Sequence, residues 1–427
     1  MEGIRAEPKV GATEGGDARH WAAAAQSHGN DARGVRFIFY ANELIGLGQL
    51  RRTLALAARL SDWACSPSSL ILTGSPVEPT FQMPPRVDTV KLPGRSRDHS
   101  GRQYSAQLEL DTDELSAMRS SIALAAATSF RPDVAVIDKL PLGHAGELAA
   151  TLEALKQSSH CKLVLGLRDI DDSPSNVRRK WGPDVRRAIE RYYDLILVYG
   201  PESTPDAIDC IGRLELGVPI HHVGYVGIPV PDNGPGDLES GYLLITAGGG
   251  FDGFRLISTF AEAVRLRPLG YRSVIVTGPL MAPAQRRRIR DVTAGLDIEV
   301  HELRRDMESV IAGARAVVSM AGYNTVSEVM RAHKPALLVP RAGPSEEQLI
   351  RAEQLAAAGV QDMIHPRDLT PESLRDALDG LLVREPPPTN SSYEGGTERA
   401  AEILTQLARS TRTQPQTPCQ AIPVPLR

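Results

Sequence analysis

The fold is decided by the stretch Arg315-Ala-Val-Val-Ser-Met-Ala-Gly322-Tyr-Asn-Thr325-Val-Ser-Glu328-Val. An apolar strand, Ala316 to Ser319, runs into a glycine turn at Gly322, and a helix follows whose first two turns carry Asn324, Thr325 and Glu328. Backbone N–H groups in the first turn of a helix have no intrahelical partner and lie at the positive end of the helix dipole. Such a turn can bind a diphosphate without the help of a lysine.

A second apolar strand, Ala336 to Val339, brings further polar residues to the same region. It ends at Pro340, and the Gly- and Pro-rich loop that follows leads to Glu347 and Gln348. Open α/β sheets bind ligands in the crevice outside the carboxyl ends of their parallel strands. We therefore expect both strand ends and these two polar side chains to form one site for a nucleotide sugar.

A second glycine cluster supports the first. Residues 241–247 are typical of a buried β-strand, the cluster Gly248, Gly249 and Gly250 follows, and a helix is expected from Phe254 to Leu266. A strand, a glycine turn and a helix in this order can cradle a phosphate. One such turn is as often an ordinary strand-to-helix connection, but two of them in one half of the chain favour the phosphate site.

Strands and helices alternate along the rest of the chain, which predicts an α/β fold with parallel sheets and helices on both faces. In the first half, two of the helices are expected at residues 143–157 and 175–193. The Pro- and Gly-rich segment 228–237 predicts a linker between two domains. The expected organisation is a disordered extension at 1–33, a first domain at 34–227, a linker at 228–241, a second domain at 242–390, a terminal helix region at 391–410 that crosses back onto the first domain, and a disordered tail at 411–427.

The second half resembles glycosyltransferase family 28, whose members have the GT-B fold of two Rossmann-like domains facing across a cleft. The stretch quoted above matches the family motif small-Gly-x-x-Thr-x-x-Glu. The resemblance implies that Gly322 and Thr325, with Asn324 between them, belong to the phosphate turn. It implies that Glu328 binds the ribose hydroxyls of the donor. It also implies that the pair Glu347-Gln348 reaches the hydroxyls of the donor sugar.

This resemblance covers residues 242–365 best, and it extends to the base of the nucleotide. The segment Glu302-Leu-Arg-Arg-Asp-Met307 resembles the family segment whose backbone packs on the base. Arg304 and Met307 are therefore implied to lie near the base edge.

The first half carries a glycine loop where the family places its catalytic base. The loop reads Tyr40-Ala-Asn-Glu43-Leu-Ile-Gly46-Leu-Gly48-Gln49-Leu-Arg51-Arg52 and resembles the family 28 loop, which typically closes with a catalytic histidine. Gly46 and Gly48 are expected on the acceptor side. Position 49 is glutamine, and an amide can orient a hydroxyl or a phosphate but cannot act as a general base. Nucleotide-sugar binding is unaffected by this departure, and the identity of the base is open.

Carboxylates near strand ends are the alternatives to that histidine. Asp138 directly follows a predicted strand and Glu43 lies in the glycine loop, so either could be the base. Lys139, Arg168 and Asp169 also follow strands, and we expect them on the acceptor side of the cleft. The structural alternative is that Asp138 caps the next turn and that Arg168 and Asp169 form a local ion pair.

The composition limits the range of functions. The chain has 427 residues, of which 42% are hydrophobic and 23% charged, as in a globular protein of two or three domains. Its formal net charge of −4 gives no basic surplus for a nucleic acid partner. Its four cysteines form no CxxC pair, and no His/Cys spacing is typical of a metal site. We expect a reduced, metal-free, cytoplasmic protein.

The sequence gives little sign of a membrane partner. It contains no run of about 18 apolar residues that would predict a spanning helix. The basic segment Val177 to Tyr193 leaves peripheral membrane contact open, but its acidic residues favour a solvated helical face.

The function predicted from these features is inverting, metal-independent glycosyl transfer from a nucleotide diphosphate sugar, most simply a UDP-sugar, to an unidentified acceptor. No cofactor is expected beyond this donor substrate. One alternative of the same fold is a UDP-sugar hydrolase or 2-epimerase, in which water or the sugar itself replaces the acceptor. Another is a non-catalytic sugar-nucleotide-binding protein, which Gln49 would favour.

Overall fold

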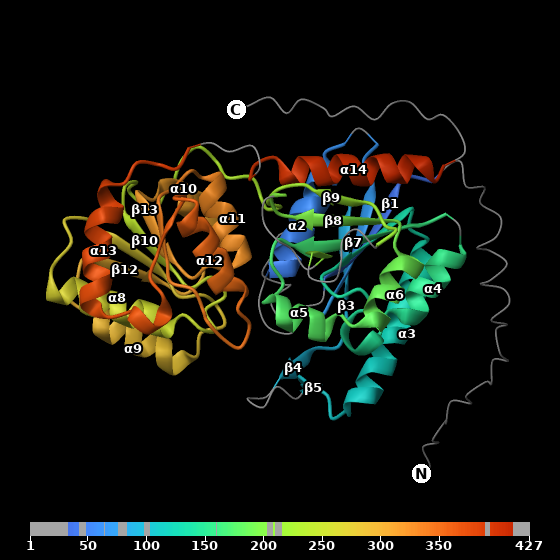
Figure 1. Cartoon of the computed structure of the whole chain (residues 1–427), viewed down its shortest axis with the longest axis horizontal. Coiled ribbons are helices and arrows are strands. Elements are labelled where there is room, and N and C mark those ends of the chain that lie inside the picture. Colours follow the sequence, from blue (N-terminus) through green and yellow to red (C-terminus); the bar gives the residue numbers. More distant parts are fainter. Residues whose placement is uncertain are drawn as a thin grey trace, which may run out of the picture. The chain divides into compact units, whose positions relative to one another are not determined.

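The computed structural model of the chain describes residues 33–41, 48–63, 65–75, 83–97, 103–158, 160–202, 208–209, 216–388 and 393–412. Residues 35–427 form one compact unit, which contains two separate parallel β-sheets (Figure 1). The predicted disordered extension and tail fall almost wholly outside the described residues.

The first sheet has seven parallel strands in the order β3-β2-β1-β6-β7-β8-β9. Most of its residues are buried on both faces, as expected for parallel strands that helices cover on either side. Its strands are β1 (Arg36–Ala41), β2 (Ser68–Thr73), β3 (Val87–Lys91), β6 (Val134–Asp138), β7 (Lys162–Arg168), β8 (Leu195–Tyr199) and β9 (Ile220–His222).

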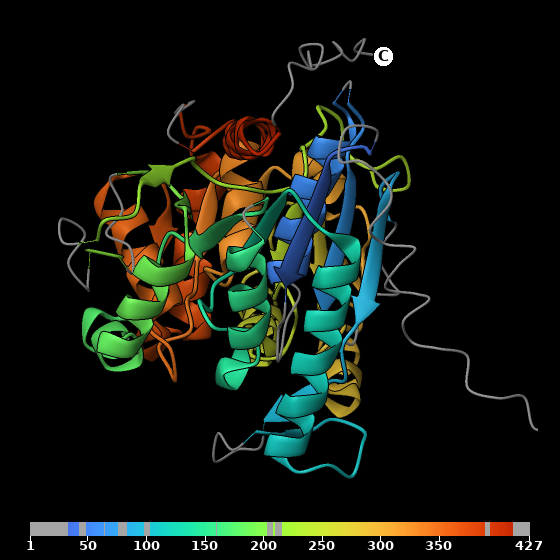
Figure 2. The same ribbon diagram turned by 90° about the vertical axis from the view of Figure 1, so that its right-hand side faces the viewer.

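Helices pack on both faces of this sheet. One face is covered by α2 (Gly48–Ser61) and by the last helix of the chain, α14 (Gly396–Ser410), which packs against α2. The helices on the other face are α3 (Thr112–Phe130), α4 (Ala149–Gln157), α5 (Pro174–Lys180) and α6 (Pro183–Tyr192). A short hairpin of β4 (Arg95–Arg97) and β5 (Gln103–Ser105) lies against α3 (Figure 2).

The second sheet has six parallel strands in the order β12-β11-β10-β13-β14-β15. They are β10 (Leu243–Thr246), β11 (Ser273–Val276), β12 (Ile298–His301), β13 (Ala316–Ser319), β14 (Ala336–Leu338) and β15 (Asp362–Met363). On one face pack α8 (Phe254–Leu266), α9 (Pro283–Thr293) and α13 (Pro371–Val383), and on the other α10 (Met307–Gly313), α11 (Tyr323–Arg331) and α12 (Glu347–Ala357).

Both sheets reverse their strand order at one point, between β1 and β6 in the first and between β10 and β13 in the second. At such a point the connections leave to opposite faces and a crevice opens at the carboxyl ends of the strands. Asp138 is the last residue of β6, and the two glycine turns at residues 248 and 322 follow β10 and β13. The topology therefore places Asp138 and the two glycine turns at the switch points of their sheets.

The predicted α/β fold with two Rossmann-like halves is confirmed, and two of its helices are corrected. The helix expected at 143–157 is a 3-10 turn, His144–Gly146, followed by α4, because Gly143 and Gly146 adopt positive φ angles of 70° and 77°. The helix expected at 175–193 is broken into α5 and α6, because Pro183 lacks the N–H that a continuous helix needs. No helix or strand interrupts residues 228–241, and the predicted domain boundaries stay predictions.

Candidate functional site

The two glycine turns of the second half lie side by side. β10 and β13 are paired in parallel, with Thr246 opposite Ser319, so both strands end at the same edge. A Cβ atom at Gly248 would lie 3.5 Å from the Thr325 hydroxyl. Gly250 has a φ of +95°, and a Cβ there would come within 2.4 Å of a carbonyl oxygen, so only glycine fits this turn.

Gly322 caps α11, and no described residue crowds it. Its φ of −66° suits any residue, and among the described residues no atom lies within 4 Å of the position that a Cβ would occupy. The helix begins there, because the N–H of Val326 donates to the carbonyl oxygen of Gly322 at 3.0 Å. The N–H groups before Val326 therefore have no intrahelical partner, which is the arrangement that binds a phosphate.

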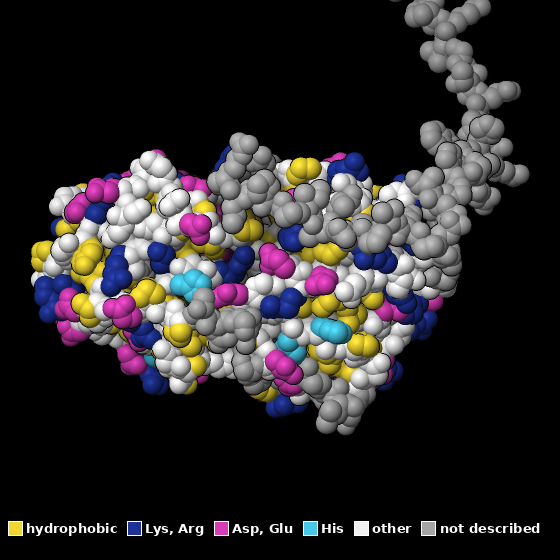
Figure 3. Space-filling view, turned by 90° about the horizontal axis from the view of Figure 1, so that it is seen from above, with side chains coloured by type: hydrophobic (Ala, Val, Ile, Leu, Met, Phe, Trp, Pro, Cys, Tyr) yellow, Lys and Arg dark blue, Asp and Glu magenta, His cyan; other side chains and the backbone are white. Residues whose placement is uncertain are grey.

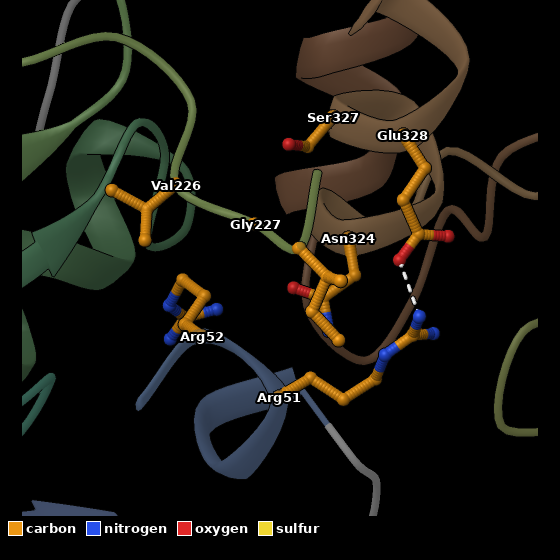
Figure 4. A pocket seen from close by; sticks show the side chains of 8 residues that line it. Arg51, Arg52, Val226, Gly227, Asn324, Ser327 and Glu328 are labelled. Carbon is orange, nitrogen blue, oxygen red and sulfur yellow. Dashed lines mark ion pairs between the residues drawn. The ribbon is translucent and has the colours of Figure 1, made fainter. Parts of the chain in front are cut away.

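Glu328 is buried in the second turn of α11, with 4% of its surface exposed. Its Oε1 lies 2.7 Å from Nη2 of Arg51, which comes from α2 of the first half (Figure 4). The same nitrogen lies 2.5 Å from Oε1 of Glu308 on α10. Burial and the neighbouring Glu308 carboxylate raise the pKa of Glu328 to about 7, although Arg51 and Arg331 act in the opposite direction.

Glu347 and Gln348 lie at the start of α12, at the end of the loop that follows β14. Glu347 forms ion pairs with Arg168 from the first half and with Arg341 at 3.4 Å. Burial alone would raise the pKa of Glu347, but Arg168 and neighbouring cations outweigh it and lower the pKa to about 2. Oε1 of Gln348 accepts from the backbone N–H of Arg341 at 3.1 Å. Both predicted sugar contacts are therefore held by protein groups in this state.

The predicted base-edge residues lie at the start of α10. Arg304 donates to Asp237 and Asp306, and the hydrogen bonds to Asp237 and then to Asp306 raise its pKa further above the usual range. Met307 is the first residue of α10 and is half-buried against the core. The side chain of Arg304 thus connects Asp237, which precedes β10, to Asp306 at the start of α10. Met307 keeps part of its surface accessible.

Asp138 and Gln49 are buried at the switch point of the first sheet. Both oxygens of Asp138 accept from Nη2 of Arg52, at 3.0 and 2.9 Å. The side chain is thus engaged by the helix after the glycine loop, and the interpretation that it caps the next turn is wrong. The other carboxylate considered as a base, Glu43, lies outside the described residues, as does Gly46.

Arg168 and Asp169 do not form the local ion pair considered above. Arg168 pairs with Glu347, and Asp169 accepts from Nε and Nη2 of Arg351 on α12, at 2.7 and 2.6 Å. Lys139 lies 3.4 Å from Asp171. Residues at the strand ends of the first half are therefore bound to the start of α12 in the second half.

A small cavity remains between the two halves. It has an empty volume of about 190 Å³ and is lined by Arg51, Arg52, Val226, Gly227, Ile228, Asn324, Ser327 and Glu328. Nδ2 of Asn324 donates to the carbonyl oxygen of Gly48 at 3.3 Å, which closes one side. On another side Arg51 pairs with Glu328, so a ligand of this carboxylate would compete with a contact between the halves.

The sequence predicts no role for two residues of this site, Arg51 and Glu308. Arg51 belongs to the segment that closes the glycine loop. A signal was available, because a helix dipole disfavours cations in the first turn, and α2 has two arginines near its start. Glu308 had no comparable signal, since it meets Arg51 only through the tertiary fold.

The described residues contain no group of three or more His, Cys, Asp and Glu side chains arranged to hold a metal ion. In the same part of the chain, no helix is long and apolar enough to cross a membrane. Charged side chains of both signs are interspersed over the visible described surface in Figure 3.

Comparison with known proteins agrees with this architecture. Residues 243–407 match the family model described as the glycosyltransferase family 28 C-terminal domain. A relative from Phenylobacterium zucineum, UDP-N-acetylglucosamine--N-acetylmuramyl-(pentapeptide) pyrophosphoryl-undecaprenol N-acetylglucosamine transferase, is 32% identical over 43% of this chain and 51% of its own length. Across three relatives of this name, the chain spans 32%, 51% and 47% of their length.

Solved structures show the same fold at low sequence identity. Acinetobacter baumannii MurG is 16% identical, with a TM-score of 0.53 over 88% of this chain and 100% of its own. The UDP-GlcNAc 2-epimerase from Methanocaldococcus jannaschii is 11% identical, with a TM-score of 0.53 over 87% and 100%. The chain therefore has the GT-B fold and is family 28-like, with a glycosyltransferase family 28 C-terminal domain at residues 243–407.

Proposed function

We propose that the protein is an inverting glycosyltransferase that takes its sugar from a UDP-sugar. The observation that carries this proposal is the buried carboxylate of Glu328, two turns into a helix whose glycine-capped N-terminus is open among the described residues. A carboxylate accepts two ribose hydroxyls at once through charge-assisted hydrogen bonds. The helix N-terminus beside it suits the diphosphate that follows the ribose.

In this reaction the second half holds the donor. The N–H groups after Gly322 would stabilise the negative charge that develops on the leaving diphosphate, which lowers the barrier most when the donors are already oriented. Glu347 and Gln348 would orient the donor sugar after Arg168 and Arg341 release them. Helix N-termini and glycine turns do this work, so we propose that no divalent metal is needed.

The acceptor hydroxyl needs a base in the first half, and Gln49 cannot supply it. We propose a carboxylate, with Asp138 and Glu43 as the two candidates. Asp138 is fixed by Arg52, so it would act from a rigid position. Gln49, buried in the first turn of α2, would orient the acceptor.

The relatives named above transfer N-acetylglucosamine from a UDP-sugar, which makes UDP-N-acetylglucosamine the first donor to test. Because the aligned parts cover at most about half of three of those relatives, their acceptor does not carry over, and the acceptor of this chain stays open. A cytoplasmic location is part of the proposal, since UDP-sugars are the substrates.

A second candidate is a UDP-sugar hydrolase or 2-epimerase. Gln49 does not separate it from a transferase, because an attacking water and an acceptor hydroxyl both need a base. The GT-B fold includes a UDP-GlcNAc 2-epimerase, so the fold does not decide between the two.

The test is UDP release from UDP-N-acetylglucosamine by the full chain, with and without a cell extract as a source of acceptors. Release that depends on the extract is expected for a transferase. Equal release without the extract indicates a hydrolase, and a changed sugar without release indicates an epimerase. Absence of turnover together with saturable UDP binding would leave only a binding protein.

A further inference from the structure

Arg51 forms an ion pair with Glu328, the carboxylate that would bind the ribose in the proposed function. It comes from the first turns of α2, yet its guanidinium lies among helices of the second half, 2.7 Å from Glu328 and 2.5 Å from Glu308. Only 17% of its side chain is exposed. Because one oxygen of this buried carboxylate is already paired with Arg51, two ribose hydroxyls would compete with Arg51 for Glu328.

Arg51 has two carboxylate partners, so it can be displaced from one of them and stay paired with the other. Two buried carboxylates, Glu308 and Glu328, share one guanidinium. The nearby Arg331 donates to the carbonyl oxygen of Ile228 at 2.8 Å and does not replace Arg51. Arg51 can therefore leave Glu328 and keep Glu308, so the cation is not stranded without a counter-charge.

The cavity beside Arg51 contains a buried hydroxyl without a partner. Oγ of Ser327 has no hydrogen-bond partner among the described residues, and Ser327 is 1% exposed. Figure 4 shows this side chain pointing from α11 toward the segment of Val226 and Gly227, in the cavity that Arg51 also lines. A polar atom of a ligand in this cavity could therefore bind this hydroxyl.

A diphosphate entering this cavity would meet two arginines. Arg52 is held by both oxygens of Asp138 and is part of the first half's buried core. Arg51 loses one of its two partners as soon as the ribose hydroxyls bind Glu328. Arginine also matches phosphate geometry through its planar fork of donors.

On the basis of the proposed function, we propose that Arg51 belongs to the donor site: it holds Glu328 while the site is empty and passes to the diphosphate when the ribose takes that carboxylate. Arg51, which belongs to the first half, then helps to stabilise the negative charge of the leaving diphosphate, and the N-terminus of α11 stabilises it from the second half. The exchange links donor binding to the rearrangement of the contact between α2 and α11.

The test compares UDP with uridine, which has the same base and ribose but no diphosphate. Calorimetry is performed on the full chain as wild type, Arg51→Ala, Arg51→Lys and Arg187→Ala. Arg187 is an exposed arginine of α6 paired with Asp184, so its variant removes the same charge away from the cavity. In Arg51→Ala, UDP should bind about 10- to 100-fold more weakly, whereas uridine should bind severalfold more tightly because its competitor for Glu328 is gone.

Arg51→Lys keeps the charge and loses the fork, so UDP binding should fall less than in Arg51→Ala while uridine binding still improves. This variant carries the test if Arg51→Ala fails to fold. Arg187→Ala should match the wild type for both ligands. If UDP and uridine change by the same factor in the Arg51 variants, Arg51 does not contact the diphosphate and the inference is overturned. If the wild type binds neither ligand, the proposed function fails first.

Discussion

At the scale of single residues, Glu328 combines a buried carboxylate, an ion pair to Arg51 and a position two turns from an open helix N-terminus. Its place on α11 could be predicted from the spacing Gly322-x-x-Thr325-x-x-Glu328. Its partner could not, because Arg51 lies 277 positions away in the sequence and the two meet only through the packing of α2 on α11.

The first prediction concerns the ribose contact. Glu328→Gln keeps the size of the side chain and removes its charge, so UDP should bind about 1–3 kcal/mol more weakly. Calorimetry measures this loss, and urea denaturation shows whether the fold is retained. Unchanged UDP affinity in a folded variant would show that the ribose binds elsewhere.

The second prediction concerns pH. The pKa of Glu328 is raised to about 7 in the empty site by burial first and by Glu308 second. Only the ionised carboxylate accepts both ribose hydroxyls, so uridine affinity should rise by roughly ninefold between pH 6 and pH 8, as the ionised fraction grows from about 10% to about 90%. Uridine is the probe because it has no phosphate that titrates in this range. This dependence of uridine affinity on pH should disappear in Glu328→Gln. If it persists in that variant, another group causes it and the prediction is wrong.

The same shift has a consequence for stability. A carboxyl whose folded-state pKa lies above the ordinary value of 4.5 binds its proton more tightly in the folded than in the unfolded chain. Its contribution to stability is therefore present at acid pH and is lost as the pH rises through about 7.

At the scale of elements, the strand-turn-helix units of the second half are recovered closely from sequence. The strand at 316–319 and the helix at 254–266 have the predicted bounds. The single helices expected at 143–157 and 175–193 are wrong, because glycines with positive φ and a proline at a helix start outweigh the apolar periodicity. The β4–β5 hairpin and β9 have only three residues per strand, too few for a period of two to be recognised.

The third prediction tests the N-terminus of α11 as the diphosphate site. Gly322→Val is compatible with the observed φ, and its Cβ would meet no atom of the described residues within 4 Å, so stability should fall by at most about 1 kcal/mol. The added side chain would fill the space expected for the diphosphate, so UDP binding should fall while uridine binding is kept.

Gly182 offers a matched control for this change. It caps α6 with a φ of −64°, and it also has open space around its Cβ position. Gly182→Val should have a similar small effect on stability and none on UDP. Equal UDP affinity in both variants would exclude the N-terminus of α11 as the phosphate site.

At the scale of the whole molecule, the contacts between the two halves are the feature that sequence reasoning could not reach. The sequence predicts that the strand ends of both halves face a ligand. In the described residues the two halves also bind each other, through Arg51 with Glu328, Arg168 with Glu347, and Arg351 with Asp169. Pairing over such separations depends on tertiary packing, for which one sequence gives no direct signal.

The fourth prediction concerns the most buried of these pairs. The side chains of Arg351 and Asp169 are 1% and 0% exposed and share two hydrogen bonds. Removing one charge leaves the other buried and unpaired, so Asp169→Leu should lower the free energy of unfolding by about 3–5 kcal/mol. The double variant Asp169→Leu/Arg351→Met should recover much of that loss in urea denaturation. A single variant as stable as the wild type would mean that the two halves do not depend on this pair.

The central claim is that this GT-B chain binds a nucleoside diphosphate through helix termini and glycine turns. The most direct measurement is a calorimetric titration of the full chain with UDP in the presence of EDTA. We expect saturable binding at one site, with the same affinity when Mg²⁺ replaces the chelator. Absence of UDP binding, or binding that appears only after Mg²⁺ or Mn²⁺ is added, would contradict it.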